Sequence, residues 1–228
     1  MNNDFVKLHR KHEHDDKIAD ALDTTRAKLE NNWQPVAIAL GIMVLLVVGI
    51  WYYLNQQGAA REEAQKRFSD AMTLATNGQV PDAIMQMGEI VRVNADKKLT
   101  ADATFMLGSL YFDTRNYTDA QKYFSEFLAL NSDNELQRAS AIAGQAYILA
   151  NQGDFAGAAS KFLESNKSHP NSALALDNFT EAVRCFLEAN DLTNARMAYD
   201  SLVARTPSGP FFVKATRLMA EKGAFAVK

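Results

Sequence analysis

Histidine and cysteine, the side chains that most often serve as metal ligands or nucleophiles, are scarce in this 228-residue chain, which has four histidines and one cysteine. Three of them, His9, His12 and His14, fall within the polar stretch HRKHEHDD, at a spacing that would let them touch one metal ion. No second group of ligands accompanies them, and such a cluster is more often a solvated tail. We therefore expect no metal site and no cofactor.

The other candidates for chemistry also have simpler explanations. His169 precedes Pro170 at a predicted helix end, where we expect the imidazole to hydrogen-bond exposed carbonyls. Cys185 has apolar neighbours, which predict a buried thiol, and a single cysteine cannot form an intramolecular disulfide. The pair Glu62-Glu63 is expected on a solvated helix face.

Composition and missing motifs narrow the function further. The chain has no glycine-rich phosphate loop, serine elbow, Cys-x-x-Cys or His-Glu-x-x-His motif. A net charge of −3 and a pI near 5.8 provide no basic surface for nucleic acid. We predict that the protein is not an enzyme, has no catalytic residues and no small-molecule substrate, and does not bind nucleic acid.

One apolar stretch indicates where in the cell the protein is located. Residues 35–54 contain no strongly polar side chain, and a helix of 20 residues spans roughly 30 Å, the thickness of the hydrocarbon core of a membrane. Aromatic side chains, which prefer the headgroup level, bracket the stretch. They are Trp33 at one end and Trp51, Tyr52 and Tyr53 at the other. The pattern predicts a transmembrane helix over 35–54.

A cleaved signal peptide is the main alternative, because QGAA at residues 57–60 offers small residues of the kind that signal peptidase accepts. However, the apolar run exceeds a signal core, and 34 mostly polar residues precede it. An uncleaved anchor is favoured. Its orientation follows from the lysines and arginines, which are more frequent before the span than shortly after it and predict a cytoplasmic N-terminus. They are Lys7, Arg10, Lys11, Lys17, Arg26 and Lys28 before it, and Arg61, Lys66 and Arg67 after it.

The anchor divides the chain into a short segment before it and a large one after it. In residues 1–34, Ile18, Leu22 and Leu29 recur at helical spacing and predict an amphipathic helix over 16–30. Residues 61–228 are long enough for a sizeable core. They are rich in helix-forming residues and show few strand signals.

The large segment repeats itself at an interval of 37 or 38 residues. Three columns recur four times each. They hold Val80, Tyr117, Phe155 and Leu192; then Ala83, Ala120, Ala158 and Ala195; then Met87, Phe124, Phe162 and Tyr199. An alanine followed four residues later by a bulky side chain suits two antiparallel helices that pack closely. The repeat therefore predicts four helical pairs.

Turn and stop residues mark the ends of these predicted helices. Each second helix is preceded by residues that favour a tight reversal, and prolines 37 residues apart end two of the second helices. The turns are Asn77-Gly78, Arg115-Asn116, Gln152-Gly153 and Asn190-Asp191, and the stops are Pro170 and Pro207. Apolar residues within 210–222 then predict a closing helix over the last repeat.

The repeat resembles the tetratricopeptide repeat. The stretch LGSLYFDTRNYTDAQKYF matches the pattern of that family best, at Leu107, Gly108, Tyr111, Tyr117, Ala120 and Phe124. The other repeats depart from the Leu-Gly pair and hold Asp70-Ala71, Gln145-Ala146 and Ala182-Val183. The resemblance implies an all-α fold: one N-terminal transmembrane helix, then an α-solenoid of about four degenerate repeats with a closing helix.

In that family, the second, fifth, ninth, twelfth and thirteenth positions of each repeat line a concave groove that binds protein segments. Carried onto this sequence, the candidate groove residues are Phe68, Met72, Phe105, Ser109, Phe112, Tyr147, Arg184 and Leu187. An equally supported interpretation is that Phe68, Phe105 and Phe112 pack between first helices or under the closing helix. The lysine and asparagine set that clamps a C-terminal carboxylate in some members does not occur here.

The whole layout, from ENNW and WYY at the ends of the span to AAREEAQKRFSDAM at the start of the repeats, resembles the YfgM-like family of bacterial inner-membrane proteins. That resemblance implies a single-pass inner-membrane protein with a cytoplasmic N-terminus and a periplasmic repeat domain. It also implies an accessory role at the Sec translocon, with translocon subunits, a membrane-anchored periplasmic chaperone or secreted polypeptides as partners. The alternative is a structural subunit of a cell-envelope or secretion-system assembly that binds through the repeat surface.

Overall fold

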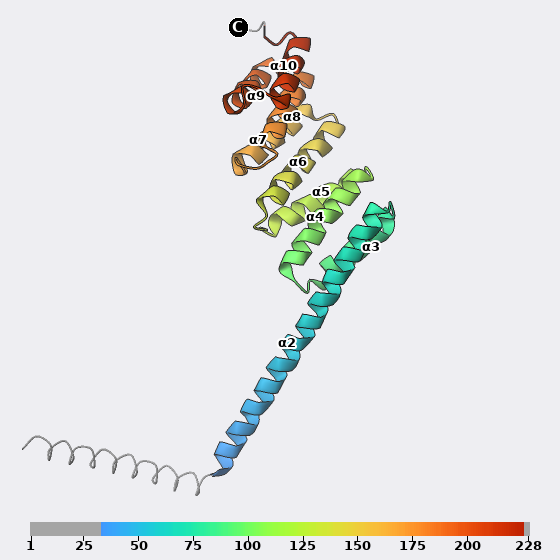
Figure 1. Ribbon diagram of the computed structural model, residues 1–228, viewed down its shortest axis with the longest axis vertical. Helices are drawn as coiled ribbons and strands as arrows, with labels where there is room; N and C mark the ends of the chain where they lie inside the picture. The colour runs from blue at the N-terminus through green and yellow to red at the C-terminus, as the bar shows by residue number, and fades with distance from the viewer. Residues whose placement is uncertain (1–32, 226–228) are drawn as a thin grey trace, which may run out of the picture. The chain divides into compact units, whose positions relative to one another are not determined.

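A computed structural model describes residues 33–225, which form nine helices and no strand (Figure 1). The predicted all-α fold is confirmed for this part of the chain. The three N-terminal histidines and the amphipathic helix expected over 16–30 lie outside the described residues. The chain divides into two compact units, Met1–Ala59 and Ala60–Lys228, which are described separately.

In the first unit, the described residues form the beginning of α2 (Trp33–Thr76). This is the one helix in the described part of the chain that is long and apolar enough to cross a membrane. None of its most apolar window is buried, and the bracketing aromatics Trp33 and Trp51 are 63% and 64% exposed. An apolar surface that the described residues leave uncovered is the kind of surface that a membrane-spanning helix presents to lipid.

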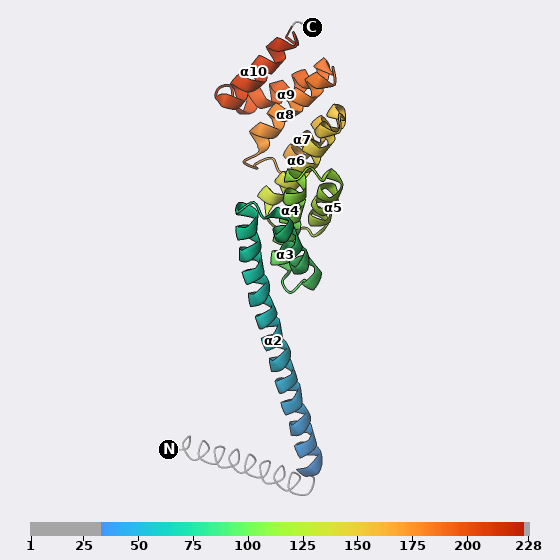
Figure 2. The same cartoon turned by 90° about the vertical axis from the view of Figure 1, so that its right-hand side faces the viewer.

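The second unit consists of helical pairs followed by a single helix (Figures 1 and 2). The end of α2, from Ala60, pairs with α3, and three further pairs follow in chain order. The bounds are α3 (Val80–Val93), α4 (Lys97–Asp113), α5 (Tyr117–Ala129), α6 (Glu135–Asn151), α7 (Phe155–Ser168), α8 (Ala175–Glu188), α9 (Leu192–Arg205) and α10 (Pro210–Glu221). Four repeats and a closing helix are therefore present, as predicted.

The reversal inside each pair has the same backbone geometry four times. The residue two positions before each second helix has a positive φ: 79° at Gly78, 62° at Arg115, 85° at Gly153 and 57° at Asn190. The next amide then donates to a carbonyl five residues earlier, as in a Schellman turn. These bonds are Gln79 N to Leu74 O, Asn116 N to Tyr111 O, Asp154 N to Leu149 O and Asp191 N to Phe186 O, at 2.8–3.0 Å.

The repeated columns of the sequence occupy the interior of the helical array. The four alanines of the second column, Ala83, Ala120, Ala158 and Ala195, are all 0% exposed. The bulky third column, from Met87 to Tyr199, is between 0% and 8% exposed. An alanine lets neighbouring helices approach, and the large side chain one turn later fills the space beside it. The repeat in the sequence therefore reflects a close helix contact that recurs in each repeat of the structure.

The two ends of the array are closed in different ways. In the second repeat, Ala103, Leu107 and Leu110 are buried against α3. The residues 37 positions earlier in the first repeat are polar and exposed: Lys66, Asp70 and Thr73. No helix of a preceding repeat covers these positions in the first repeat. This explains why Asp70 stands where the second repeat has Leu107, the leucine of the Leu-Gly pair. At the other end, α10 packs on α8 and α9 (Figure 2).

The ring of Phe124 in the second repeat lies in close contact with glycines of two neighbouring first helices. A methyl group built on Gly108 of α4 would lie 2.6 Å from Cδ1 of Phe124, and one built on Gly144 of α6 would lie 2.6 Å from Cε2 of the same ring. The Phe124 ring on α5 therefore touches the bare backbone of both neighbouring first helices. Only glycine allows such an approach at either position.

This contact predicts opposite effects for two glycine substitutions in helices. Gly108→Ala should lower the free energy of unfolding by about 1–3 kcal/mol, because the added methyl overpacks against Phe124. Gly88→Ala in α3 is the matched control: nothing lies within 4 Å of its added methyl, so the helix gains up to about 1 kcal/mol. Denaturant titration of the full chain in detergent measures both values. Equal stabilities for the two variants would contradict the proposed packing.

Candidate partner-binding surface

The eight residues predicted to line a groove all lie on the first helices of the four repeats. Seven of them are half-buried and present part of their side chains at the surface: Phe68, Met72, Phe105, Ser109, Phe112, Tyr147 and Arg184. The eighth assignment is wrong, because Leu187 is only 1% exposed. It belongs to the hydrophobic core that joins α8 to α9 and α10, which leaves no surface for a partner.

The aromatic residues among these seven also hold the repeats together. The Phe105 ring lies 5.3 Å from the Phe127 ring of α5, centre to centre. Phe112 contacts Tyr117 at 5.8 Å and Tyr147 of the next first helix at 6.4 Å. Phe112 therefore packs between first helices, which was the alternative to a role in the groove. Its ring nevertheless remains partly exposed. Structural and binding roles can coexist on such residues.

Two pockets of similar size lie on either side of the first turn of α4, and Lys98 and Asp102 line both of them. The first has a volume of about 460 Å³ and contains the predicted residue Phe68. The second has a volume of about 450 Å³ and extends to the α5–α6 connection, where it includes Leu130. Asp102 and Gln65 occupy the second position of their repeats. The repeat pattern placed that position in the groove, but these two polar residues were not among the predicted ones.

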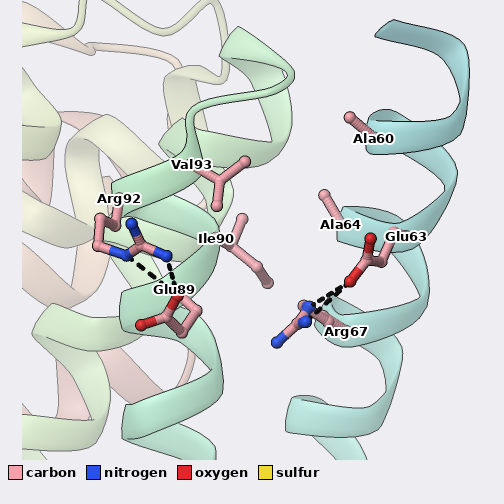
Figure 3. A pocket seen from close by; sticks show the side chains of 8 residues that line it. All are labelled: Ala60, Glu63, Ala64, Arg67, Glu89, Ile90, Arg92 and Val93. Carbon is pink, nitrogen blue, oxygen red and sulfur yellow. Dashed lines mark hydrogen bonds and ion pairs between the residues drawn. The ribbon is translucent and has the colours of Figure 1, made fainter. Parts of the chain in front are cut away.

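A third, smaller pocket of about 120 Å³ lies between α2 and α3 in the first repeat (Figure 3). Ala64 and Ile90 form an apolar floor, and two ion pairs flank it, Arg67 to Glu63 at 2.8 Å and Arg92 to Glu89 at 2.7 Å. In the second repeat, threonines that are 7% and 2% exposed replace Glu63 and Arg67. The two ion pairs are therefore part of the polar surface at the end of the array formed by the first repeat.

Charged residues connect α8, the first helix of the fourth repeat, to the closing helix α10. Arg184 Nε donates to Glu181 Oε2 at 2.7 Å, and Lys214 Nζ of α10 donates to Glu181 Oε1 at 2.8 Å. Burial raises the pKa of Glu181, but the hydrogen bonds and charges of Lys214 and Arg184 outweigh it and hold the pKa below its usual value of 4.5. Glu181 therefore stays ionised and fixes both cations.

A neighbouring polar contact connects α6 to α8. The Tyr147 hydroxyl donates to Asp177 Oδ2 at 3.3 Å. Burial, together with the negative charges of Asp177 and Glu181, raises the pKa of Tyr147 far above its usual value of 10. The hydroxyl therefore remains a donor at physiological pH, and it positions the carboxylate of Asp177 beside an aromatic ring.

These features describe a surface for binding, built on the first helices of stacked helical pairs. The family described as Tetratricopeptide repeat-like domain matches residues 27–216. The chain belongs to this family. It is thus a repeat protein of a kind suited to protein–protein interaction. The match covers the apolar helix as well as all four repeats, so the two occur together in the family.

Solved structures of repeat proteins share the fold at low sequence identity. YrrB, a tetratricopeptide-repeat protein with an unusual peptide-binding site, is 15% identical with a TM-score of 0.51, over 70% of this chain and 78% of its own. PilW, a type IV pilus biogenesis factor, is 14% identical with a TM-score of 0.53, over 71% and 70%. BtubC from P. vanneervenii is 15% identical with a TM-score of 0.55, over 68% and 71%. The comparison with curated proteins found no match.

Cys185 and His169 are the residues of the repeats whose side chains are most often reactive or metal-binding. Neither lies at this surface. Cys185 is fully buried, so the predicted buried thiol is confirmed, and burial raises the pKa of this thiol to about 11. The expectation for His169 is wrong. Its side chain is 7% exposed, and neither ring nitrogen has a hydrogen-bond partner among the described residues. Helical backbone is disfavoured before a proline, and His169, at φ −132° and ψ 66°, leaves the helix while its ring stays buried.

Within residues 33–225, no three histidine, cysteine, aspartate or glutamate side chains come together in a way that could hold a metal ion. The described surface offers half-buried rings, isolated carboxylates and a fixed guanidinium. Such groups recognise a partner through shape, apolar contact and charge.

The Glu181 contacts predict a stability that depends on pH. Because folding lowers the pKa of Glu181, its contribution is complete above pH 4.5 and is lost as the pH falls through the folded-state pKa. Glu181→Gln should therefore cost about 1–2 kcal/mol at pH 7 and progressively less in acid. Urea titrations at several pH values measure this difference.

Glu221→Gln is the matched control, since its ion pair with Arg217 is long, at 3.6 Å, and exposed on both sides. It should change the free energy of unfolding by less than about 0.5 kcal/mol at every pH. A Glu181→Gln variant that behaves like this control would show that the contacts between α8 and α10 contribute little.

Proposed function

We propose that this protein is a membrane-anchored scaffold that works beside the Sec translocon. Its repeats hold a periplasmic chaperone or an emerging secreted polypeptide near the inner membrane, through the half-buried side chains of the first helices. The anchor is residues 35–54, in contact with membrane lipid, and the repeats are periplasmic. The bound partner is a protein, and the scaffold performs no chemistry on it.

The observation that carries the proposal is the presence, in one chain, of an uncovered apolar helix and a closed array of four repeats with aromatic residues on its first helices. The apolar helix restricts the repeats to partners near a membrane. The aromatic residues Phe68, Phe105, Phe112 and Tyr147 offer large apolar contact surfaces that cost little conformational entropy on binding.

The translocon part of the proposal is supported by the resemblance to the YfgM-like family. That resemblance includes the short N-terminal segment, the aromatic ends of the span and the degenerate repeats, so it extends over nearly the whole chain. The excess of lysine and arginine before the span agrees with a cytoplasmic N-terminus. A periplasmic position of the repeats then follows from a single crossing.

The alternative is a structural subunit of an envelope assembly. Polymers of solenoid proteins commonly grow when the end face of one repeat array packs on another. Here the first repeat ends in exposed polar residues such as Lys66 and Asp70, and α10 covers the last repeat. This alternative would use the second helices or α10, where Val213 is 62% exposed, whereas the scaffold uses the partly exposed rings on the first helices.

The proposed orientation predicts the labelling of single introduced cysteines. In intact spheroplasts, a membrane-impermeant maleimide should label Ser201→Cys, an exposed position on α9, but should label Asn3→Cys only after permeabilisation. The buried thiol of Cys185 is a constant background. The reverse labelling pattern would place the repeats in the cytoplasm and exclude the translocon and chaperone role.

The proposed binding surface predicts where partners can be crosslinked. A photoreactive amino acid at Ser109 or Phe112 of α4 should capture a translocon subunit, a membrane-anchored chaperone or a secreted polypeptide in growing cells. The same group at Gln121, exposed on the second helix α5, is the matched control and should capture far less. Capture that is absent from α4, or stronger at Gln121, would contradict the use of the first helices.

A further inference from the structure

Three large apolar side chains are exposed where neighbouring helices of the repeats end and begin. Val93 at the end of α3, Leu130 just after α5 and Leu136 in the first turn of α6 are between 49% and 53% exposed. Single exposed apolar residues are common on protein surfaces, but a group of them marks a contact surface. The question is therefore whether these three residues lie together.

The first contacts of this region lie between the start of the second unit and the α3–α4 connection. Arg61 Nε, on the second residue of the unit, lies 3.7 Å from Asp96 Oδ2. Val93, three residues before Asp96, lines the small pocket of the first repeat together with Ala60 (Figure 3). The residues that begin the unit therefore lie beside the end of α3 and the beginning of α4.

Further contacts join the beginning of α4 to the α5–α6 connection. Lys98 lines the first of the two larger pockets together with residues of α2, and the second together with Leu130. Gln137 Nε2, next to Leu136 in α6, donates to Asp102 Oδ1 of α4 at 2.9 Å. The three segments thus form one joined region. We call it the anchor-side end, and it comprises residues 60–61, 93–98 and 130–137.

The covalent connection to the anchor keeps this end near the membrane. The predicted span ends at Leu54, and Arg61 follows seven positions later. Even a fully extended chain of seven residues reaches no further than roughly 25 Å. The headgroup layer itself occupies roughly 5–8 Å beyond the hydrocarbon on each side. The anchor-side end is therefore the part of the repeats that the anchor holds closest to the headgroups along the chain.

Charged side chains of both signs surround the apolar ones, three cations and three carboxylates. Because the two signs balance, charge alone would not hold this end on a lipid surface, and the apolar side chains must contribute most of the contact. A zwitterionic headgroup also carries both signs, so its phosphate can meet a lysine and its ammonium a carboxylate. The charged residues of the anchor-side end are Arg61, Asp96, Lys97, Lys98, Asp133 and Glu135.

We infer that the anchor-side end rests on the phospholipid surface of the membrane, with Val93, Leu130 and Leu136 among the headgroups. This inference rests on the anchor of the proposed function and adds a second contact with the membrane. Apolar side chains that reach the headgroup level leave water, and neighbouring lysines can keep their ammonium groups beside the phosphates. A span and a surface contact together would fix the direction in which the first helices present their aromatic residues.

The test places a nitrobenzoxadiazole label on single cysteines of the full chain in nanodiscs. The bilayer consists of phosphatidylethanolamine and phosphatidylglycerol with some lipid that carries a nitroxide on its headgroup, and contact with this lipid quenches the label. Quenching at Leu136→Cys should be at least about 2-fold stronger than at Met197→Cys. Met197 is the matched control, since it is an equally apolar, exposed position on α9. The buried thiol of Cys185 is a constant background.

Serine substitutions test whether the apolar side chains make the contact. Val93→Ser with Leu130→Ser should reduce the quenching at Leu136→Cys to the level of the α9 control. Met85→Ser with Val213→Ser removes two other exposed apolar side chains and should leave the quenching unchanged. All four residues are exposed, so each pair should change Tm by at most about 4 °C. Quenching should persist in high salt, because the charges of this end balance.

Three results would overturn the inference: quenching at Leu136→Cys no stronger than at Met197→Cys, quenching that the serine pair leaves unchanged, or quenching that high salt abolishes. A label at Leu54→Cys, at the predicted end of the span, shows separately whether the anchor has inserted. Quenching at Leu54→Cys without quenching at Leu136→Cys overturns the inference and leaves the proposed function standing. Quenching at neither position removes the anchor on which both depend.

Discussion

Close contact between neighbouring helices at small residues is the constraint on which the rest of the structure depends. Ala83, Ala120, Ala158 and Ala195 are fully buried where each second helix meets its first helix, and Phe124 rests on the bare backbone of two glycines. Because the backbones come this close, each repeat can present only one face of its first helix to solvent. The aromatic residues of the candidate binding surface, Phe68, Phe105, Phe112 and Tyr147, all lie on first helices.

Much of this architecture could be predicted because the same physical requirement recurs every 37 or 38 residues. A left-handed turn, a small residue and a bulky residue must reappear wherever a helical pair reverses and packs, so four weak signals in phase define the fold. Even the departure at Asp70 now has a physical cause, since the first repeat has no earlier neighbour to cover that position. The expected stops at Pro170 and Pro207 agree with α7 and α9, which end two residues before each proline.

The binding surface was less predictable, because it depends on contacts between residues far apart in the chain. Leu187 occupies a groove position in its repeat, but it is buried in the core shared by α8, α9 and α10, which no pattern within the repeat shows. Gly144 lies outside the repeat pattern, and its importance depends on the direction in which Phe124 points from another helix. The burial of His169 similarly follows from the path of the chain after the helix, which the local sequence does not specify.

The polar end of the first repeat has a consequence for how the protein can be organised in a membrane. If neither end accepts another array, each molecule offers one contact surface and is not extended by copies of itself. The number of partners recruited to a region of membrane would then equal the number of anchored chains. The amount of the protein in that region of membrane, and not its polymerisation, would then limit how many partners are held there.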